Sequence, residues 1–310
     1  MPISITVIYQ ELLIFIILYL MIFISNMPLI LVFFNQVTGA NQGIGYGIVR
    51  RLCKEHPDWT IYGTSRGALN GEEAAKKLQS GGLKAQFLEA DLTKPETFAA
   101  VKEKLTKDHG GLDILINNAG MAFKVECFHR PYAVKAEVTL ATNVFGTNMV
   151  CDTLFPILKN GARVVVLSSM RAPMALHKVK KLNPRDTLHL SRTILPDRTE
   201  VLQAMTDFVS AVKAGDFAEK GWPDDEAYSV SNLGDTLLAR AYQQEFNSVS
   251  ERDIVVNAVC PGYVSTSMSS HKGHLTIDEG ADTPYYLAVL PPNTEIRGQH
   301  VCKRQIVKWE

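Results

Sequence analysis

Short apolar runs alternate with segments in which apolar residues recur every three or four positions, from residue 37 to the end of the chain. This alternation predicts a parallel β-sheet with helices on both faces, because parallel strands need a crossover between them. The runs that predict strands are residues 60–65, 87–90, 112–116, 163–167, 254–259 and 300–303. The segments that predict helices are residues 46–55, 71–79, 96–107, 134–158 and 225–247. We therefore expect one α/β domain over residues 37–310, built on a single doubly wound parallel sheet.

The first 36 residues do not fit this alternation. Every residue from Leu12 to Ile24 is apolar, and no charged residue occurs between Glu11 and Arg50. A helix of that apolar length spans roughly 20 Å, against about 30 Å for a bilayer core. A secretory signal is a poor match, because no Lys or Arg precedes the apolar run. Membrane association through residues 12–24 is still one interpretation. The other interpretations are a buried hydrophobic extension and a segment that is not part of the mature protein.

Two polar residues mark the junction between this extension and the domain. Asn35 and Gln36 stand directly before Val37, where a central parallel strand is usually a near-continuous apolar run. Burying each amide without a partner would cost about 1–3 kcal/mol. We expect residues 1–36 to be a poorly adapted or incorrectly assigned start, joined to a standard domain.

Composition narrows the possible functions. The 310 residues carry 32 basic and 32 acidic side chains, so no net field attracts nucleic acid or an anionic membrane. The five cysteines are widely spaced and form no CxxC or Cys/His pattern, which argues against both a disulfide framework and a zinc site. A reduced, cytoplasmic setting without a metal is expected.

A glycine-rich turn follows the first predicted strand. Gly39, Gly43 and Gly45 are spaced as in a turn that lets backbone amides approach a pyrophosphate and lets helix and strand pack closely. The N–H groups and the dipole at the start of residues 46–55 would then attract phosphate. The alternative is a purely structural turn. The cofactor-binding residues expected in this turn are Gly39, Asn41, Gln42, Gly43, Ile44 and Gly45.

The end of the second predicted strand indicates which dinucleotide would bind. NAD sites commonly place an acid there, to accept a hydrogen bond from the ribose 2′-hydroxyl. This strand instead ends in Ser65-Arg66, and a guanidinium suits a 2′-phosphate. NADP is therefore favoured over NAD, although Arg66 could also be a solvated surface charge.

Four further motifs complete a family pattern. They are residues 111–120 (Gly-Leu-Asp-Ile-Leu-Ile-Asn-Asn-Ala-Gly), Ser168-Ser169, Ala227-Tyr228 and Cys260-Pro261-Gly262. With the glycine turn, they resemble the short-chain dehydrogenase/reductase family. Residues 118–125, 136–139 and 221–223 carry a closer likeness to its NADPH-dependent carbonyl reductase branch. The resemblance covers residues 37–310 and implies a Rossmann-like fold.

The resemblance implies roles for individual residues. Ser169 would hold the substrate oxygen, Tyr228 would donate the proton, and Asn143 would hold a water in the proton relay. A donor aimed at the carbonyl oxygen is what its conversion to an alkoxide requires. Tyr263 is expected to form a wall of the substrate pocket. The remaining cofactor contacts implied are Asp91, Leu92, Asn118, Tyr228, Pro261, Gly262, Val264 and Thr266. Close relatives often have a lysine where this chain has Gln42, so one phosphate contact is expected to be missing.

One position departs from the family pattern. Asn232 stands four residues after Tyr228, one helical turn along the same face, where the family has a lysine. That lysine holds the nicotinamide ribose and lowers the pKa of the tyrosine; a nearby cation usually shifts a pKa by about 1–3 units. Asparagine brings no charge, and Asp235 on the same helix would oppose a tyrosinate. We expect turnover to be lower by a factor of roughly 10²–10⁴ than in a relative that has the lysine.

The spacing between the two hydroxyl residues is also distinctive. In this chain 58 residues separate Ser169 from Tyr228, where most family members have about a dozen. The insertion, about residues 170–224, contains a helical pattern at 199–212. It is expected to fold beside the substrate mouth, against the helices that other members use for oligomer contacts. A monomer is therefore predicted.

The leading function is NADPH-dependent reduction of small ketones, aldehydes or quinones to alcohols. The alternative is a catalytically inactive NADP-binding protein on the same fold, with Asn232 as its signature. A membrane-tethered form of either depends on residues 12–24. Nothing in the chain indicates a nucleic-acid partner.

Overall fold

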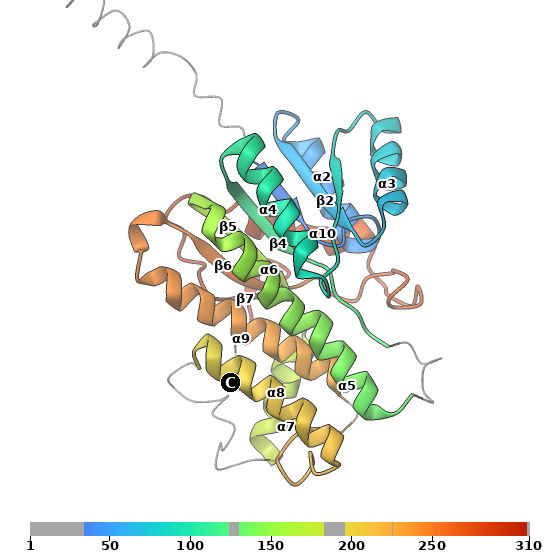
Figure 1. Cartoon of the computed structure of the whole chain (residues 1–310), viewed down its shortest axis with the longest axis vertical. Coiled ribbons are helices and arrows are strands. Elements are labelled where there is room, and N and C mark those ends of the chain that lie inside the picture. Colours follow the sequence, from blue (N-terminus) through green and yellow to red (C-terminus); the bar gives the residue numbers. More distant parts are fainter. Residues whose placement is uncertain (1–33, 124–129, 183–195, 225, 309–310) are drawn as a thin grey trace, which may run out of the picture. The chain divides into compact units, whose positions relative to one another are not determined.

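The computed structural model describes residues 34–123, 130–182, 196–224 and 226–308 (Figure 1). The apolar stretch at residues 12–24 lies outside these ranges, as does the predicted extension up to residue 33. No helix in the described ranges is both long enough and apolar enough to cross a bilayer.

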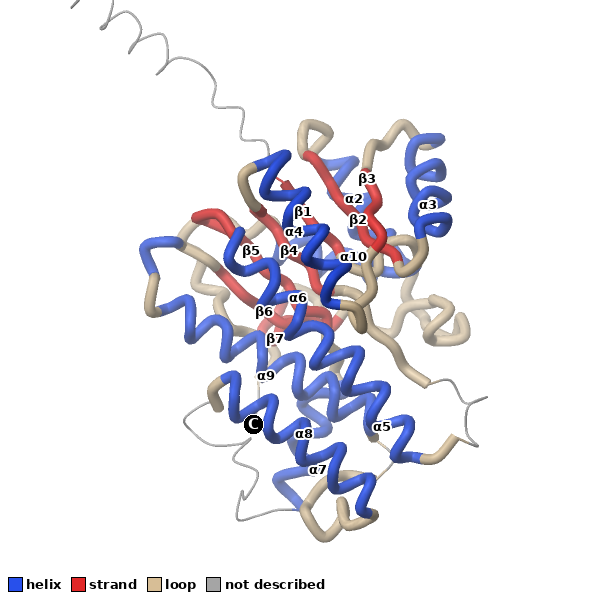
Figure 2. Tube along the Cα trace, in the orientation of Figure 1, coloured by secondary structure: helices blue, strands red, loops and turns tan. Residues whose placement is uncertain are grey.

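Figure 2 shows a single sheet with helices on both sides. Its strand order is β3-β2-β1-β4-β5-β6-β7-β8, and all neighbours are parallel except β7 and β8. The predicted doubly wound fold is confirmed, with the reversal of strand order at β1 and β4. The strands are β1 (Phe34–Val37), β2 (Thr60–Ser65), β3 (Gln86–Glu89), β4 (Leu112–Asn117), β5 (Leu158–Leu167), β6 (Val255–Cys260), β7 (His300–Cys302) and β8 (Gln305–Ile306).

The helices follow the prediction in part. The described helices are α2 (Gly43–Glu55), α3 (Ala68–Ser80), α4 (Pro95–His109), α5 (Tyr132–Leu140), α6 (Gly146–Leu154), α7 (Arg171–Leu182), α8 (Arg198–Ala214), α9 (Ala227–Asn247) and α10 (Ile277–Ala288). A π-helical turn, η2 (Ala141–Phe145), joins α5 to α6. The single helix predicted over residues 134–158 is therefore wrong: it is divided at η2, ends in a 3₁₀ turn at Phe155–Ile157, and gives way to β5 at Leu158. Helix α10 was not predicted.

The sheet separates two hydrophobic cores. Along β4, Leu115 packs into one core, whereas Ile114 and Ile116 pack into the other. This alternation is the period of two that a strand buried on both faces requires. Helices α4 to α9 supply the first core, and α2, α3 and α10 supply the second. The result is a rigid platform whose strand ends carry the loops described below.

The insertion contributes α7 and α8, and its predicted place beside the substrate mouth stays a prediction. Figure 1 shows α7 and α8 beside α9, and α8 also contacts α5. Helix α8 begins with a capping box, in which Asp197 and Glu200 satisfy each other's backbone N–H groups. Its buried Phe208 meets the ring of Trp222 edge-on at 5.1 Å between centroids. The insertion thus belongs to the core on the α9 side of the sheet.

Strand β1 contains the polar pair noted in the sequence. Asn35 and Gln36 are 0% exposed, and β1 lies between β2 and β4. Both polar atoms of the Asn35 side chain and Oε1 of Gln36 have no hydrogen-bond partner among the described residues. The Gln36 Nε2 makes one long bond, 3.4 Å, to the carbonyl of Val37. The strand therefore buries amides that its neighbours do not satisfy.

Candidate active site

A cavity of about 320 Å³ opens at the carboxyl ends of the parallel strands. This is the place where ligands bind in doubly wound sheets, because the crossovers on either side of the switch point leave a crevice. Several segments far apart in the sequence meet there. The lining residues include Gly39, Asn41, Gln42, Gly43, Ile44, Arg66, Asp91, Leu92, Asn118, Asn143, Tyr228, Asn232, Pro261 and Thr266, all of them singled out from the sequence.

The glycine turn has the conformation that its spacing predicts. Gly39 and Gly43 have φ values of 60° and 57°, in the left-handed region that favours glycine. A Cβ at Gly45 would lie 2.4 Å from Nδ2 of Asn118, so a side chain there would displace the neighbouring loop. Helix α2 begins at Gly43, and the Gln42 side chain makes no capping hydrogen bond. The N–H groups of its first turn therefore remain available to an anion.

Asn118 fastens the loop after β4 to this turn. Its side-chain Nδ2 donates to the carbonyls of Thr38 and Gly39, at 2.8 and 3.1 Å. The Thr38 hydroxyl in turn accepts the backbone N–H groups of Asn118 and Ala119, both at 2.9 Å. The contact of Asn118 with the adenosine ribose stays a prediction, while its role in holding the two loops together is visible.

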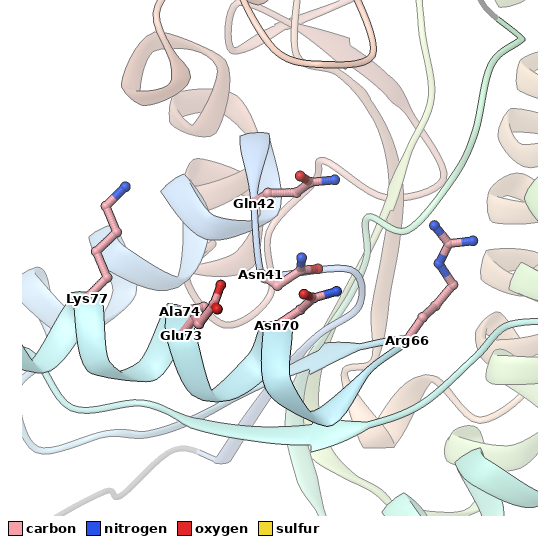
Figure 3. Close-up of a pocket in the computed structure, with 7 residues that line it drawn as sticks. All are labelled: Asn41, Gln42, Arg66, Asn70, Glu73, Ala74 and Lys77. Carbon is pink, nitrogen blue, oxygen red and sulfur yellow. The ribbon is translucent and has the colours of Figure 1, made fainter.

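A second, polar cavity of about 390 Å³ adjoins the first (Figure 3). The two share Asn41, Gln42 and Arg66. Figure 3 shows Asn70 and Glu73 projecting from α3 toward the glycine turn, and Lys77 one turn farther along α3, beside α2. The sequence reasoning missed these three, although their spacing places them on one helical face. Arg66 therefore lines a cavity beside the glycine turn, together with the cation Lys77 and the acid Glu73.

The two serines after β5 are held differently. The Ser168 hydroxyl bonds to the carbonyl of Asn232 at 3.0 Å and to the hydroxyl of Thr236 at 2.7 Å, so it is committed to α9. Ser168, and not Ser169, is among the residues that line the first cavity. The half-buried Ser169 hydroxyl accepts only the backbone N–H of Arg171, at 3.2 Å, and keeps its own proton free to donate.

Tyr228 lies in the first turn of α9 and lines the cavity. Burial raises the pKa of its phenol above 10. The side chain of Asn232 and the guanidinium of Arg171 act in the opposite direction, and Asp235 and Cys260 add to the increase. The Arg171 effect comes from α7, in the insertion, and was not foreseen from the sequence of α9 alone. The balance leaves Tyr228 protonated at neutral pH.

Asn143 lies in the π-turn η2 and joins the loop after β4 to α9. Its Oδ1 accepts the N–H of Met121 at 2.8 Å, and its Nδ2 donates to the Met121 carbonyl at 2.9 Å and to the Ser231 hydroxyl at 3.0 Å. Both Ser231 and the Nδ2 of Asn232 donate to the Tyr228 carbonyl, at 2.9 and 2.7 Å. The Asn143 amide is thus fully bonded to protein, and its predicted hold on a relay water stays a prediction.

Other predicted residues lie outside the lining of the cavity. Gly45, Ser169, Gly262, Tyr263 and Val264 are not among the residues that form it. Tyr263 is half exposed, and its ring lies 6.0 Å from that of His274. In the described ranges no group of His, Cys, Asp and Glu side chains could hold a metal ion.

The sequence and the fold of this chain are similar to those of known reductases. Residues 35–180 match the family model described as short chain dehydrogenase. The chain is 41% identical to carbonyl reductase (NADPH) 1 of Rattus norvegicus over 276 residues, which cover 88% of this chain and 97% of that protein. It is 40% identical to carbonyl reductase (NADPH) 3 of the same organism over 275 residues, with the same coverage. Salutaridine reductase from Papaver somniferum shares the fold, with a TM-score of 0.70, 24% identity and coverage of 86% and 99%.

Proposed function

Because this chain belongs to the short-chain dehydrogenase/reductase family, in its NADPH-dependent carbonyl reductase branch, we propose that it reduces small ketones, aldehydes or quinones to alcohols with NADPH. The observation that carries the proposal is the shared cavity. One opening is lined both by the glycine turn at the start of α2 and by Tyr228 of α9. A dinucleotide site and a proton donor therefore face the same space, as hydride transfer to a carbonyl requires.

The residues present fit NADPH. The glycine turn leaves room that a Cβ would fill, and the free N–H groups at the start of α2 suit a pyrophosphate. Arg66, with Asn41 and Gln42 beside it, suits the 2′-phosphate. When bound, NADPH supplies the hydride that reaches the carbonyl carbon.

The protein's own part is to hold the carbonyl oxygen and give it a proton. Ser169 would donate a hydrogen bond to that oxygen, and Tyr228 would transfer its phenolic proton as negative charge develops there. A phenol whose pKa is raised is still far more acidic than an alkoxide's conjugate alcohol, so Tyr228 remains a competent acid. It is a poor base, because the phenolate needed for alcohol oxidation is scarce at neutral pH. The site is therefore suited to reduction more than to the reverse reaction.

Asn232 sets the expected rate. It is 4% exposed and neutral, and it bonds to the carbonyl of its own helix. Without a cation at this position we expect turnover roughly 10²–10⁴ below that of a relative with a lysine. The competing proposal is an NADP-binding protein that performs no reduction, and the same residue motivates it.

The test is to titrate the purified full-length protein with NADPH and to follow NADPH oxidation with menadione, a small quinone. Wild type and Asn232→Lys are compared under saturating NADPH. Slow but measurable reduction by wild type, with at least a tenfold increase in Asn232→Lys, supports the reductase. NADPH binding without turnover in either protein supports the inactive alternative. Equal rates in the two proteins would reject the argument about Asn232.

Assembly and location are further parts of the proposal. Helix α8 lies against α5 and α9, which favours a monomer because it covers surface that could otherwise pair with a second copy. Size-exclusion chromatography with light scattering tests this, and a stable dimer or tetramer would contradict it. We propose a cytoplasmic protein, and carbonate-resistant membrane association of the full chain would contradict that location.

A further inference from the structure

Asp235 is a buried acid in the candidate active site that the reaction outlined above does not use. It is 5% exposed and lines the same cavity as Asn143, Tyr228 and Asn232. It follows Asn232 by three residues and Tyr228 by seven, so the three side chains share one face of α9. Among the described residues its Oδ1 has no hydrogen-bond partner. A polar group in that position needs an explanation, because leaving it unsatisfied is costly.

In the described part of the chain, burial alone shifts the pKa of Asp235, and no cation opposes it. Beside the neighbouring Gly234, α8 and η2 present Met205 and Val144. Helix α5 and strand β5 add apolar side chains to the same core. Five cations on the elements that pack on α9 form salt bridges with other acids: Lys178 with Glu226, Arg198 with Asp152 and Glu245, Lys213 with Glu137, Lys159 with Asp113, and Arg163 with Asp253. Further ionisable groups near α9 and the cavity include Cys151 of α6, Cys260 of β6, Arg171 and His177 of α7, Arg252 of the 3₁₀ turn Ser250–Arg252, and Arg66 and Asp91 of the cavity lining. Arg171 acts on Tyr228, and Arg252 bonds to Leu158 and Asn160.

Burial therefore decides the protonation state. It raises the pKa of Asp235 well above the usual range of a carboxyl group, with no opposing contribution. A second buried acceptor, Oδ1 of Asn117, is also without a partner. Both residues are close to Cys151: Nδ2 of Asn117 donates to its sulfur at 3.3 Å, and a charge on Asp235 raises its pKa. An unpaired, buried carboxyl group that lines a cavity is favoured in its protonated form, in which its O–H can donate to bound water.

We propose that Asp235, in its protonated form, returns a proton to Tyr228 after each reduction. This proposal rests on the proposed reductase function. Seven residues of helix separate the two by about 10 Å along the axis, so the proton passes through bound water or hydroxyl groups and not by direct contact. In the first step the phenolic O–H bond of Tyr228 breaks as the O–H bond of the alcohol forms. In the second, the O–H bond of Asp235 breaks as that of Tyr228 reforms, and the carboxylate then takes a proton from solvent.

The direction of the second step follows from acid strength. An unperturbed carboxylic acid is about six pKa units more acidic than a phenol. Burial raises the pKa of both Asp235 and Tyr228, and this initial difference favours transfer from the carboxyl group to a tyrosinate. A tyrosinate formed during reduction is therefore a ready acceptor. With Asn232 in place of a lysine, the described face of α9 offers no other ionisable group closer to Tyr228 than Asp235. Asp235 acts through Tyr228 and does not touch the carbonyl.

The test compares wild type with Asp235→Asn, which keeps the shape and polarity of the side chain but removes the ionisable proton. Asp207→Asn is the matched control, since Asp207 lies exposed on α8 and bonds only to Gln203. We measure kcat for menadione from pH 6 to pH 10 at saturating NADPH. We also record the infrared spectrum of each protein at pH 7. A protonated carboxyl group gives a carbonyl stretch in that spectrum, and a carboxylate does not.

We expect wild-type kcat to fall as pH rises and Asp235 loses its proton. Asp235→Asn should lower kcat about tenfold or more at pH 7 and remove that fall, with KM for NADPH unchanged. The carbonyl stretch should be present in wild type and in Asp207→Asn and absent from Asp235→Asn. Asp235→Glu, which keeps an ionisable proton, should restore the pH dependence.

Three results would overturn the proposal. If Asp235→Asn kept the wild-type kcat and pH profile, Asp235 would not be the proton donor to Tyr228, and the reductase function would stand. A carboxylate at pH 7 in the wild-type infrared spectrum would lead to the same conclusion without any variant, which keeps the test decisive if a variant fails to fold. Tight NADPH binding with no turnover would reject the reductase function itself, and the proton supply with it.

Discussion

Replacing Asn35 by leucine should stabilise the protein, although it removes a polar side chain from the middle of the sheet. Asn35 is fully buried in β1, and neither polar atom of its amide has a partner among the described residues. Leucine has nearly the same shape and leaves the backbone hydrogen bonds of β1 to β2 and β4 in place. The substitution therefore removes a desolvation cost without opening a cavity.

The magnitude follows from the two unpaired atoms. An unsatisfied buried polar group costs about 1–3 kcal/mol, and burying the apolar replacement adds a favourable contribution. Two unpaired atoms together give a range of about 2–6 kcal/mol. We expect the free energy of unfolding to rise by about 2 kcal/mol, the lower end of that range, because leucine does not match the site perfectly. In a domain of this size class each kcal/mol raises Tm by about 2–4 °C, so Tm should rise by about 4–8 °C.

A matched control is available on β6. Asn257 is equally buried, but its Nδ2 donates to the Ile296 carbonyl at 2.7 Å and its Oδ1 accepts the Gln299 N–H at 2.8 Å. Asn257→Leu makes the same chemical change and should destabilise, by about 1–3 kcal/mol. Urea denaturation and thermal unfolding of the purified full-length proteins measure both. A neutral or destabilising Asn35→Leu would refute the reasoning, since it would mean that this amide is satisfied in the folded protein.

Four further predictions concern the site and its support. Tyr228→Phe should lower kcat for carbonyl reduction by about 10²–10⁴ without weakening NADPH binding, measured by stopped-flow and fluorescence titration. Because burial raises the pKa of Tyr228, alcohol oxidation with NADP should be slow at pH 7 and rise continuously toward pH 10. Arg66→Ala should reduce the preference for NADPH over NADH by about tenfold or more, and Glu73→Gln should increase it, as ratios of kcat/KM report. Burial alone raises the pKa of Asp253, but hydrogen bonds from a backbone N–H and two arginines lower it below its usual value. Its contribution to stability is therefore present above the unfolded pKa and lost as pH falls through the folded one. Asp253→Asn should cost about 1–3 kcal/mol at pH 7 and progressively less below pH 4, measured by urea denaturation.

The sequence contained enough information for the sheet, and less for the helices. Strand β4 could be predicted because its apolar run has no competing helical period. The boundary at Leu158 could not, because helical periodicity continues through residues 134–158, and the π-turn and the 3₁₀ turn that divide this stretch depend on packing. Helix α10 had a usable signal in its capping box, Thr276 with Glu279, but Pro284 inside it obscures the helical pattern.

At the site, the residues adjacent to motifs were predictable and those brought in by tertiary packing were not. Gly39 to Gly45 and Tyr228 carry their own local signals. Lys77 lines the polar cavity only because α3 packs near α2, and its Nζ lies 5.2 Å from the ring of Tyr46 on α2. Arg171 influences Tyr228 only because α7 packs on α9. For Asp235 the helical face could be predicted, but its burial and lack of a partner could not.

The hydrogen bonds of the Thr38 hydroxyl affect how the cofactor binds. This hydroxyl accepts two N–H groups from the loop after β4, and so it ties together segments that are 80 residues apart in the chain. With the Asn118 side chain, this clamp preorganises the cradle, and little ordering entropy is left to be lost when the dinucleotide arrives. Amide protons of Asn118 and Ala119 should accordingly exchange slowly with deuterated solvent in the apo protein, with only a small further slowing when NADPH is added.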